Sequence, residues 1–457
     1  MTPEEFRRYG HQAIDWIAEF LAHVERYPVL PPVRPGDLTD ALPLHGPEHG
    51  EPMDAIVADF ERLIVPASTQ WNHPGFLAYF ANSSTPEGIL GELYAAAING
   101  NGMVWKTSPA VTELEQVTLR WLRQWSGLPE DWFGAIFDTA STSSMHAIAA
   151  AREAVDPDAR TSGSVPGLIV YTSQQSHASI EKGAIALGIG RDYVRQVPVD
   201  DVFRMRPDAL HEMIRWDLAA GLRPCCVAAT IGTTSTTSVD PVPAIAQICK
   251  QHNIWLHIDA AYAGSAALMP EFRWAFEGCE HADSFVTNPH KWLFVPMDCS
   301  VFYTARPDVL RRAFSLSREY LDTAEDSRAV NMMDYGVPLG RRFRALKLWF
   351  VLRSYGREGL AAALREHVRL AHWFAREIEA DSRFELAAPA LFSVVNFRFK
   401  GSNEDNRRIL EQVNAAGGIF LSSTVLNGKF TLHLAVGNQF TTGRHLQQAL
   451  DLVRAAV

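Results

Sequence analysis

Lys291 is the side chain of this sequence best suited to covalent chemistry. It follows a short apolar run at 284–287 and stands in the motif Asn-Pro-His-Lys-Trp at 288–292. A lysine held at the end of a buried strand lies in a dry environment, where the ammonium form is disfavoured and the free amine is available. Such an amine can form a Schiff base with an aldehyde. On its own, Lys291 is more often a solvated loop lysine, and two other stretches decide between these interpretations.

Asp259 follows a second apolar run, at 254–258. In α/β sheets, ligands bind beyond the carboxyl ends of the strands. A carboxylate at that place can keep a pyridine nitrogen protonated, which pyridoxal phosphate needs in order to act as an electron sink. Ala261 is small enough to let a flat ring lie against it. An aspartate that caps the helix after a strand is the alternative explanation.

The third stretch, Thr139-Ala140-Ser141, lies between an apolar run at 135–137 and a segment at 145–154 without glycine or proline, which predicts a helix. Hydroxyl groups and backbone amides at a helix N-terminus form an anion site that suits a phosphate. An ordinary helix cap explains the same residues equally well. The three stretches together would supply a lysine, a carboxylate and a phosphate site.

Longer motifs surround these candidates. They stand at 257–265 (His-Ile-Asp-Ala-Ala-Tyr-Ala-Gly-Ser), at 288–292 and at 339–349 (Leu-Gly-Arg-Arg-Phe-Arg-Ala-Leu-Lys-Leu-Trp). Asn-His-Pro at 72–74 and Ser-Pro-Ala-Val-Thr-Glu-Leu-Glu at 108–115 extend the agreement over most of the chain. With these motifs the sequence resembles the group II pyridoxal-phosphate decarboxylases, of which aromatic-L-amino-acid decarboxylase is the best-known member.

The resemblance implies an α/β fold of the aspartate-aminotransferase-like type, pyridoxal-phosphate fold type I. Residues 85–346 would form the large cofactor-binding domain with a seven-stranded, mainly parallel sheet, and residues 347–457 a small α+β domain. Residues 1–84 would form a helical segment that wraps the partner subunit of a homodimer; packing on its own chain is the alternative. The alternation of apolar runs and helical stretches over 135–303 favours an α/β domain independently. Thr-Pro-Glu-Glu at 2–5 is a capping box that predicts the start of the first helix.

Roles for individual residues also come from the resemblance. Lys291 would hold pyridoxal 5'-phosphate, and Asp259 would pair with its ring nitrogen. His177 would lie flat against the ring, and Tyr320, in a polar stretch expected to form a lid, would return a proton to Cα. These four are the expected catalytic residues. The expected cofactor-binding residues are Thr139, Ala140, Ser141, His177, Thr234, Asp259, Ala261, Asn288, His290 and Lys291.

The resemblance places the substrate side chain in an apolar pocket, built partly from across the dimer. Its expected residues are Trp71, Tyr79, Phe80, Asn101, Met103 and Gly340. Asn101 and Met103 stand where the animal enzymes have an aliphatic residue and a phenylalanine, so the outline of the pocket stays open. Gly340 matches the glycine of the aromatic decarboxylases and favours an aromatic side chain.

The expected reaction is decarboxylation of an aromatic L-amino acid, of the tryptophan, tyrosine, phenylalanine or dihydroxyphenylalanine type, to its amine and CO2. One alternative is an aldehyde synthase, in which the same intermediate reacts with oxygen. Such relatives tend to carry phenylalanine in place of the lid tyrosine or asparagine in place of the stacking histidine. This chain keeps Tyr320 and His177. Decarboxylation of a non-aromatic amino acid is a second alternative, and a non-catalytic cofactor-binding scaffold is a third.

Composition excludes several classes of protein. The 457 residues are 47% hydrophobic and 21% charged, which is typical of globular proteins, and the net charge of −10 argues against a nucleic-acid partner. The absence of a long apolar run and of a signal-peptide pattern predicts a cytoplasmic protein without a membrane partner. Five cysteines in no metal-ligand spacing predict no metal site and a reducing compartment.

Overall fold

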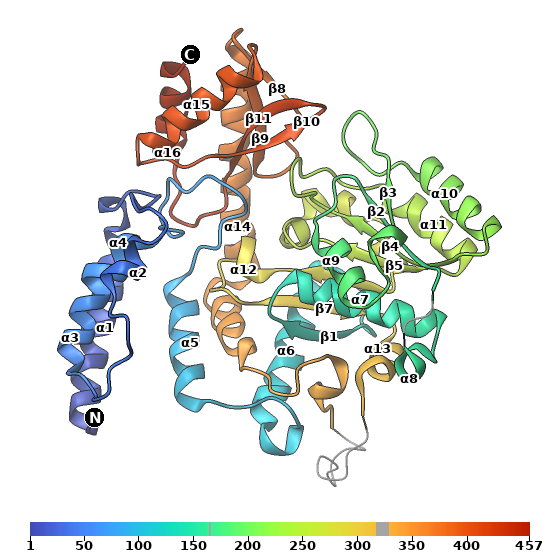
Figure 1. Ribbon diagram of the computed structural model, residues 1–457, viewed down its shortest axis with the longest axis horizontal. Coiled ribbons are helices and arrows are strands. Elements are labelled where there is room, and N and C mark those ends of the chain that lie inside the picture. Colours follow the sequence, from blue (N-terminus) through green and yellow to red (C-terminus); the bar gives the residue numbers. More distant parts are fainter. Residues whose placement is uncertain (164–165, 317–328) are drawn as a thin grey trace.

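The computed structural model describes residues 1–163, 166–316 and 329–457. At its centre lies a seven-stranded sheet with the order β1-β7-β6-β5-β4-β2-β3. The strands from β6 through to β3 are parallel, whereas β7 is antiparallel to both its neighbours. The expected seven-stranded, mainly parallel sheet is therefore confirmed (Figure 1). The strands are β1 Phe133–Phe137, β2 Leu168–Ser173, β3 Val194–Val197, β4 Arg223–Thr230, β5 Trp255–Asp259, β6 Ser284–Thr287 and β7 Ser300–Thr304.

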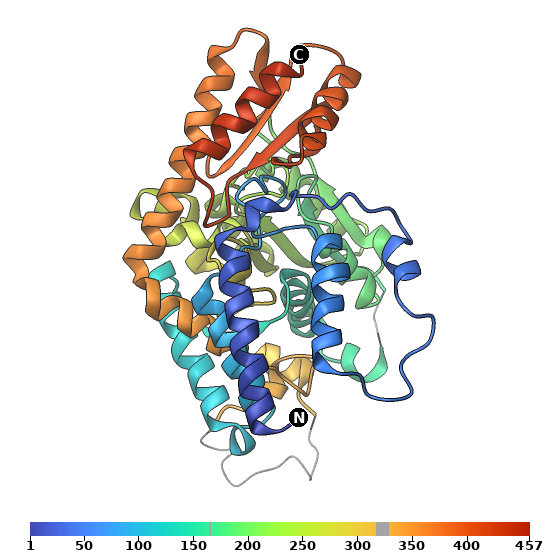
Figure 2. The same cartoon turned by 90° about the vertical axis from the view of Figure 1, so that its left-hand side faces the viewer.

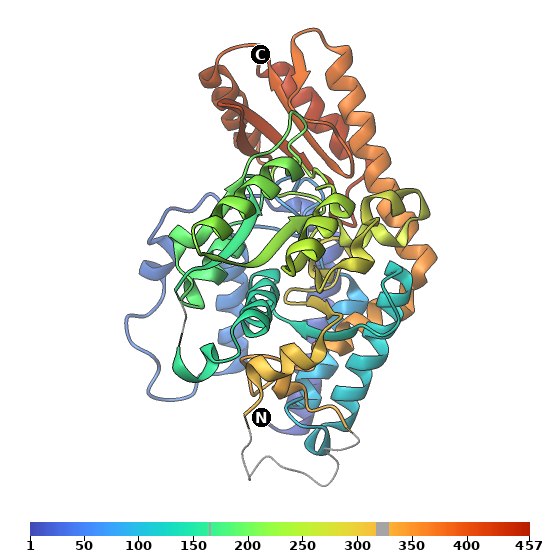
Figure 3. The same cartoon turned by 90° about the vertical axis from the view of Figure 1, so that its right-hand side faces the viewer.

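Helices cover both faces of this sheet (Figures 1 and 3). Alternate strand residues belong to two separate cores: Val170 and Phe302 pack with α7, α9 and α13, whereas Tyr171 and Val227 pack with α10 and α11. A sheet buried on both faces needs apolar residues at every position, which is why its strands are continuous apolar runs in the sequence. The helices are α6 Pro109–Ser126, α7 Ala140–Val155, α8 Ala159–Ser162, α9 Ser179–Ala186, α10 Pro207–Ala219, α11 Val242–His252 and α13 Pro307–Phe314.

A long helix, α14 (Arg344–Ala380), leads from the large sheet to a second, antiparallel sheet with the order β10-β11-β9-β8. Gly356 interrupts the helix with a left-handed φ of 62°, a conformation that only glycine adopts without strain. The second sheet packs its own apolar core against the C-terminal half of α14 and two further helices. The elements are β8 Phe384–Leu386, β9 Val394–Phe399, α15 Asn403–Ala415, β10 Ser422–Leu426, β11 Lys429–Ala435 and α16 Gly443–Ala455.

The N-terminal helices stand apart from both sheets (Figures 1 and 2). α1 begins with the expected capping box, in which Thr2 accepts from the backbone of Glu5, and none of its residues is buried. Trp16 contacts Phe60 edge-on at 5.0 Å between ring centres, so α1 packs on the following helical segment. The elements are α1 Pro3–Ala22, α2 Asp37–Ala41, α3 Met53–Asp59, α4 Val65–Ala67 and, next to α14, α5 Pro86–Ile98.

None of the helices in the described ranges has the length and apolar character needed to cross a membrane. Within the same ranges, no cluster of His, Cys, Asp and Glu side chains could hold a metal ion. All five cysteines are buried as free thiols. Burial raises their pKa, to about 12 for Cys225, so these thiols are unreactive packing residues.

Candidate active site

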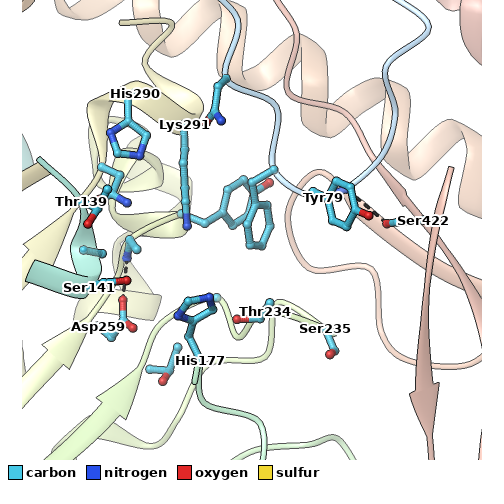
Figure 4. Close-up of a pocket in the computed structure, with 18 of the residues that line it drawn as sticks. Tyr79, Thr139, Ser141, His177, Thr234, Ser235, Asp259, His290, Lys291 and Ser422 are labelled. Atoms are coloured by element: carbon cyan, nitrogen blue, oxygen red, sulfur yellow. Dashed lines mark hydrogen bonds between the residues drawn. The ribbon is translucent and has the colours of Figure 1, made fainter. Parts of the chain in front are cut away.

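A cavity of about 450 Å³ opens at the carboxyl ends of β4, β5 and β6 and at the N-terminus of α7 (Figure 4). Strands of an α/β sheet deliver ligand-binding residues at this edge. The cavity brings Lys291 and Asp259 together with the residues at the start of α7, which lie more than a hundred positions earlier in the sequence.

Lys291 lies on a single helical turn, α12 (Pro289–Trp292), directly after β6. Burial lowers the pKa of Lys291, and the nearby Asp259 carboxylate opposes this effect only in part. The Nζ atom lies 5.0 Å from the centre of the Phe80 ring. Because the free amine is the nucleophilic form, this environment prepares Lys291 for covalent bonding to an aldehyde.

Three aromatic rings form a stack beside the lysine. Phe80 lies on Tyr262 with 4.0 Å between ring centres, and Tyr262 lies on Trp292 at 4.7 Å. The hydroxyl of Tyr262 shares a hydrogen bond with Ser393, next to β9 in the second sheet. The stack therefore connects α12 to the substrate side of the cavity and to the C-terminal part of the chain.

Asp259 is the last residue of β5 and is 4% exposed. Its Oδ1 accepts a hydrogen bond of 3.1 Å from the backbone N–H of Ala261, which fixes the direction of the carboxylate. Ala261 packs with Ala140 and Val286 in a small apolar cluster on the wall of the cavity. A charged carboxylate beside a flat apolar surface is the arrangement that a protonated pyridine ring requires.

The start of α7 is suited to a phosphate. Thr139 is the N-cap, and the first amides of any helix have no partner within the helix. Ser141 follows in the first turn and lines the cavity. Together these groups supply hydroxyl and N–H donors at the positive end of the helix dipole.

Two further residues complete the phosphate site from the side of β6. His290 Nδ1 accepts from the N–H of Cys299 at 2.9 Å, and burial lowers the pKa of His290 to about 4, so the ring is neutral and carries its proton on Nε2. The side-chain Oδ1 of Asn288 is buried without a partner among the described residues. A phosphate here would accept from the His290 Nε2–H, from an Nδ2–H of Asn288 and from the donors at the start of α7, whereas the Asn288 Oδ1 needs a donor. The residues present therefore fit pyridoxal phosphate.

His177 and Thr234 line the opposite side of the cavity (Figure 4). His177 lies two residues before α9, and burial lowers its pKa, with Asp259 opposing and Lys291 reinforcing the shift. Thr234 follows the turn at Gly232, where a φ of 82° and the closeness of Ala263 leave no room for a side chain. This turn directs the chain from the end of β4 into the cavity wall.

The structure brings some of the expected substrate residues into the cavity and leaves others outside it. Tyr79 and Phe80 line it. Trp71 lies next to Phe76, with 4.3 Å between ring centres, outside the cavity lining. Tyr320 lies outside the described residues.

Asn101, Met103 and Gly340 form a separate group at the start of α14, away from the cavity of their own chain. The Oδ1 of Asn101 accepts from the N–H of Arg341 at 2.9 Å, next to Gly340. Met103 packs against Met333. A single chain therefore does not bring all the expected substrate residues together.

The far wall of the cavity contains polar residues that the sequence did not suggest. Tyr79 N–H donates to Ser422 Oγ at 3.2 Å, and Thr424 Oγ1 donates to Ser235 Oγ at 3.0 Å. His433, buried and neutral, lies beside them and bonds Asn396 through Nδ1 at 3.1 Å. The signal that could have found them is the polar run Ser-Ser-Thr at 422–424 inside a strand-like segment.

A lysine amine, a buried carboxylate and a helix N-terminus at one edge of a mainly parallel seven-stranded sheet define a pyridoxal-phosphate enzyme of fold type I. Residues 35–400 match the pyridoxal-dependent decarboxylase conserved domain, and the chain belongs to this family. It is a pyridoxal-phosphate-dependent carboxy-lyase.

Three relatives illustrate the range of this family. The chain is 41% identical to aromatic-L-amino-acid decarboxylase of Mus musculus, over 99% of this chain and 97% of the relative. It is 38% identical to phenylacetaldehyde synthase of Arabidopsis thaliana, over 99% and 96%. The crystal structure of Oryza sativa TDC with PLP and tryptamine has a TM-score of 0.97 at 34% identity, and covers 100% of this chain and 98% of that one.

Proposed function

We propose that this protein removes the carboxylate of an aromatic L-amino acid, of the tryptophan, tyrosine, phenylalanine or dihydroxyphenylalanine type, and releases the amine and CO2. The observation that carries the proposal is the shared cavity: Lys291 and Asp259 lie at one end of it, Phe80 lies next to the lysine, and Tyr79 lies across from them (Figure 4). The similarity to the mouse decarboxylase and to the structure that contains tryptamine supports an aromatic side chain.

The cofactor would be held by the groups that fit it. Lys291 provides the amine for its aldehyde, Asp259 the carboxylate for its ring nitrogen, and Ala261 a flat contact for its ring. The phosphate is assigned to Thr139, Ala140, Ser141, Asn288 and His290. When bound, pyridoxal phosphate supplies an electron sink for the electron pair that the departing CO2 leaves behind.

The remaining residues orient the substrate and move protons. His177 faces the cofactor side of the cavity, where it can direct the substrate carboxylate and stack on the ring. Phe80 and Tyr79 offer aromatic surfaces to the substrate side chain, which exclude water from the reacting carbon. Tyr320, outside the described residues, is the proposed donor of the proton that returns to Cα.

We also propose a cytoplasmic homodimer in which residues 1–84 wrap the partner and the group around Asn101, Met103 and Gly340 completes the partner's cavity. Exposed large apolar side chains support this interface, because apolar surface gathered on a few elements is typical of a contact site. On α5 they are Leu90, Leu93, Tyr94 and Ile98, which are 40–62% exposed, and on the N-terminal segment they include Phe6, Ile14, Ile56, Phe60 and Ile64.

The test is an amine-release screen of the holoenzyme with the twenty amino acids and dihydroxyphenylalanine, with peroxide measured in the same reactions. We expect amine and CO2 in equal amounts from at least one aromatic substrate and little peroxide. The similarity to the Arabidopsis phenylacetaldehyde synthase makes an aldehyde synthase the second candidate. Stoichiometric aldehyde, ammonia and peroxide would establish that activity instead, and amine from a non-aromatic acid alone would contradict the substrate class.

A further inference from the structure

The imidazole of His177 is anchored to the helix that follows it. Its Nδ1 lies 2.8 Å from the hydroxyl of Ser179 and accepts a second hydrogen bond, of 3.2 Å, from the backbone N–H of the same residue. Ser179 is 3% exposed, so this anchor is shielded from water, whereas His177 itself faces the cavity. The backbone is fixed too, because His177 O accepts from Ile180 N–H at 3.2 Å.

These contacts determine where the ring carries its proton. A backbone N–H can only donate, so the Nδ1 that faces it must present a lone pair. The Ser179 hydroxyl can then donate to the same lone pair, and the single proton of the neutral ring stays on Nε2. Nε2 is thus the nitrogen that remains available to the cavity.

The position of the ring at the start of α9 also favours its neutral form. Ser179 is the first residue of α9, and its N–H is one of the amides that a helix leaves without an internal partner. A positive charge at this end of a helix is unfavourable because of the helix dipole. The charged groups near His177 have opposite effects: Lys291 and Lys182 disfavour the imidazolium, and Asp259 favours it.

We propose that Ser179 is a positioning residue for the reaction, because it holds His177 as the neutral tautomer with the proton on Nε2, directed into the cavity. In this form His177 is a hydrogen-bond donor toward the substrate and can pass on its Nε2 proton. The role of the tautomer in turnover depends on the decarboxylase proposed above. The tautomer itself is a property of the folded chain and can be measured without substrate.

A matched pair of variants isolates the hydroxyl. Ser179→Ala removes the side-chain donor to Nδ1. Ser176→Ala removes a hydroxyl from the same turn that bonds the backbone N–H of Ser173 and Thr230 Oγ1 but not His177. Melting temperatures of both variants, with and without cofactor, confirm that they are folded before any other comparison.

The first measurement is two-bond ¹H–¹⁵N spectroscopy of cofactor-free protein labelled only at histidine, with the His177 signals assigned by their loss in His177→Asn. We expect the Nε2-protonated pattern in the wild type and in Ser176→Ala. Ser179→Ala keeps the backbone N–H of residue 179 but loses the hydroxyl contact of 2.8 Å. It should therefore show a weaker preference for the Nε2 proton and a higher pKa of His177, because one of the two hydrogen bonds that stabilise the neutral ring has been lost. An Nδ1-protonated ring in the wild type, or an unchanged spectrum in Ser179→Ala, would overturn the proposal.

The second measurement is steady-state kinetics with the best aromatic substrate. Loss of one hydrogen bond that orients a proton donor should lower kcat for amine about tenfold and change KM less than about twofold. The acidic limb of the kcat profile should move to higher pH in the same variant. Unchanged kcat and pH profile in Ser179→Ala would show that the tautomer does not serve turnover. If wild-type protein releases no amine at all, the proposed function fails while the spectroscopic test of Ser179 still stands.

Discussion

The two walls of the cavity are built in different ways. The inner wall consists of the ends of neighbouring strands in one sheet, with Lys291 after β6 and Asp259 at the end of β5. The outer wall joins three distant segments, through the bonds of Tyr79 to Ser422 and of Ser235 to Thr424. Tyr79 is 55% exposed and has a φ of 52°, whereas Asp259 is 4% exposed in regular strand. The sheet fixes the groups that do the chemistry, and hydrogen bonds between separate segments shape the space for the side chain.

The largest expected effect comes from removing the Lys291 amine from the inner wall. Lys291→Ala should remove the visible absorption of the bound cofactor and lower turnover by more than about 10⁴-fold, because Lys291 is the one lysine among the described residues that line the cavity. Absorption spectra and amine release measure both. Lys347→Met is the control: Lys347 is also buried, but it bonds Glu92 and does not line the cavity, so its loss should leave the spectrum intact. An unchanged spectrum in Lys291→Ala would assign the cofactor to another lysine.

The carboxylate of the inner wall should matter next. Asp259→Asn keeps the shape of the side chain but removes the charge that stabilises a protonated ring nitrogen. We expect kcat to fall about 10²- to 10³-fold, the range seen when a preorganised electrostatic contact is removed. A fall of less than threefold, measured at saturating substrate and cofactor, would contradict this role for Asp259.

The pH dependence of stability tests the environment of Lys291 in the inner wall without any activity measurement. Burial lowers the pKa of Lys291 in the folded chain from the ordinary value of 10.5 that it has in the unfolded chain. At a pH between the folded and the unfolded pKa, the unfolded chain therefore binds more protons than the folded chain. The stability of cofactor-free protein should therefore rise with pH in this window, by at most about 1.4 kcal/mol per pH unit from this group. Lys291→Met should lack the contribution. Urea unfolding of both proteins from pH 7 to pH 10 tests this, and parallel stability curves would contradict it.

The outer wall should give the smallest effect. Thr424→Val removes the hydrogen bond to Ser235 and should change the ratio of kcat/KM between two aromatic substrates about fivefold, the equivalent of about 1 kcal/mol, with the cofactor spectrum unchanged. Thr431→Val is a close control, because Thr431 pairs with Thr424 across the two strands but bonds the carbonyl of Lys429. Equal effects of the two variants would mean that Thr424 acts through the stability of the sheet.

The inner wall could be predicted from the sequence because each of its groups belongs to a short local pattern. An apolar run followed by Asp259 or by Lys291 implies a strand that ends in a polar side chain, and the fold then places neighbouring strand ends together. The two cores follow from the same continuous apolar runs. The antiparallel direction of β7 and the short strand β8 could not be predicted, because strand direction is set by packing over the whole sheet.

The outer wall could not be predicted for a related reason. Ser235 and Thr424 are 189 positions apart, and a serine or threonine in isolation carries no signal of its partner. Asn101 and Gly340 lie next to each other but outside the cavity of their own chain, so their expected place in the substrate pocket depends on the proposed dimer. The anchor between Ser179 and His177 is local, yet a histidine two residues before a serine is too common a pattern to indicate it.

The stack of Phe80, Tyr262 and Trp292 has a consequence for anyone who wants to redesign this enzyme. Phe80 lines the cavity and also covers the lysine amine, so a smaller residue at this position would enlarge the cavity only by letting water reach Lys291. Ser235 and the residues at 422–424 also line the cavity, but they do not cover the lysine amine. Efforts to change the accepted amino acid should therefore begin at those positions and leave the aromatic stack untouched.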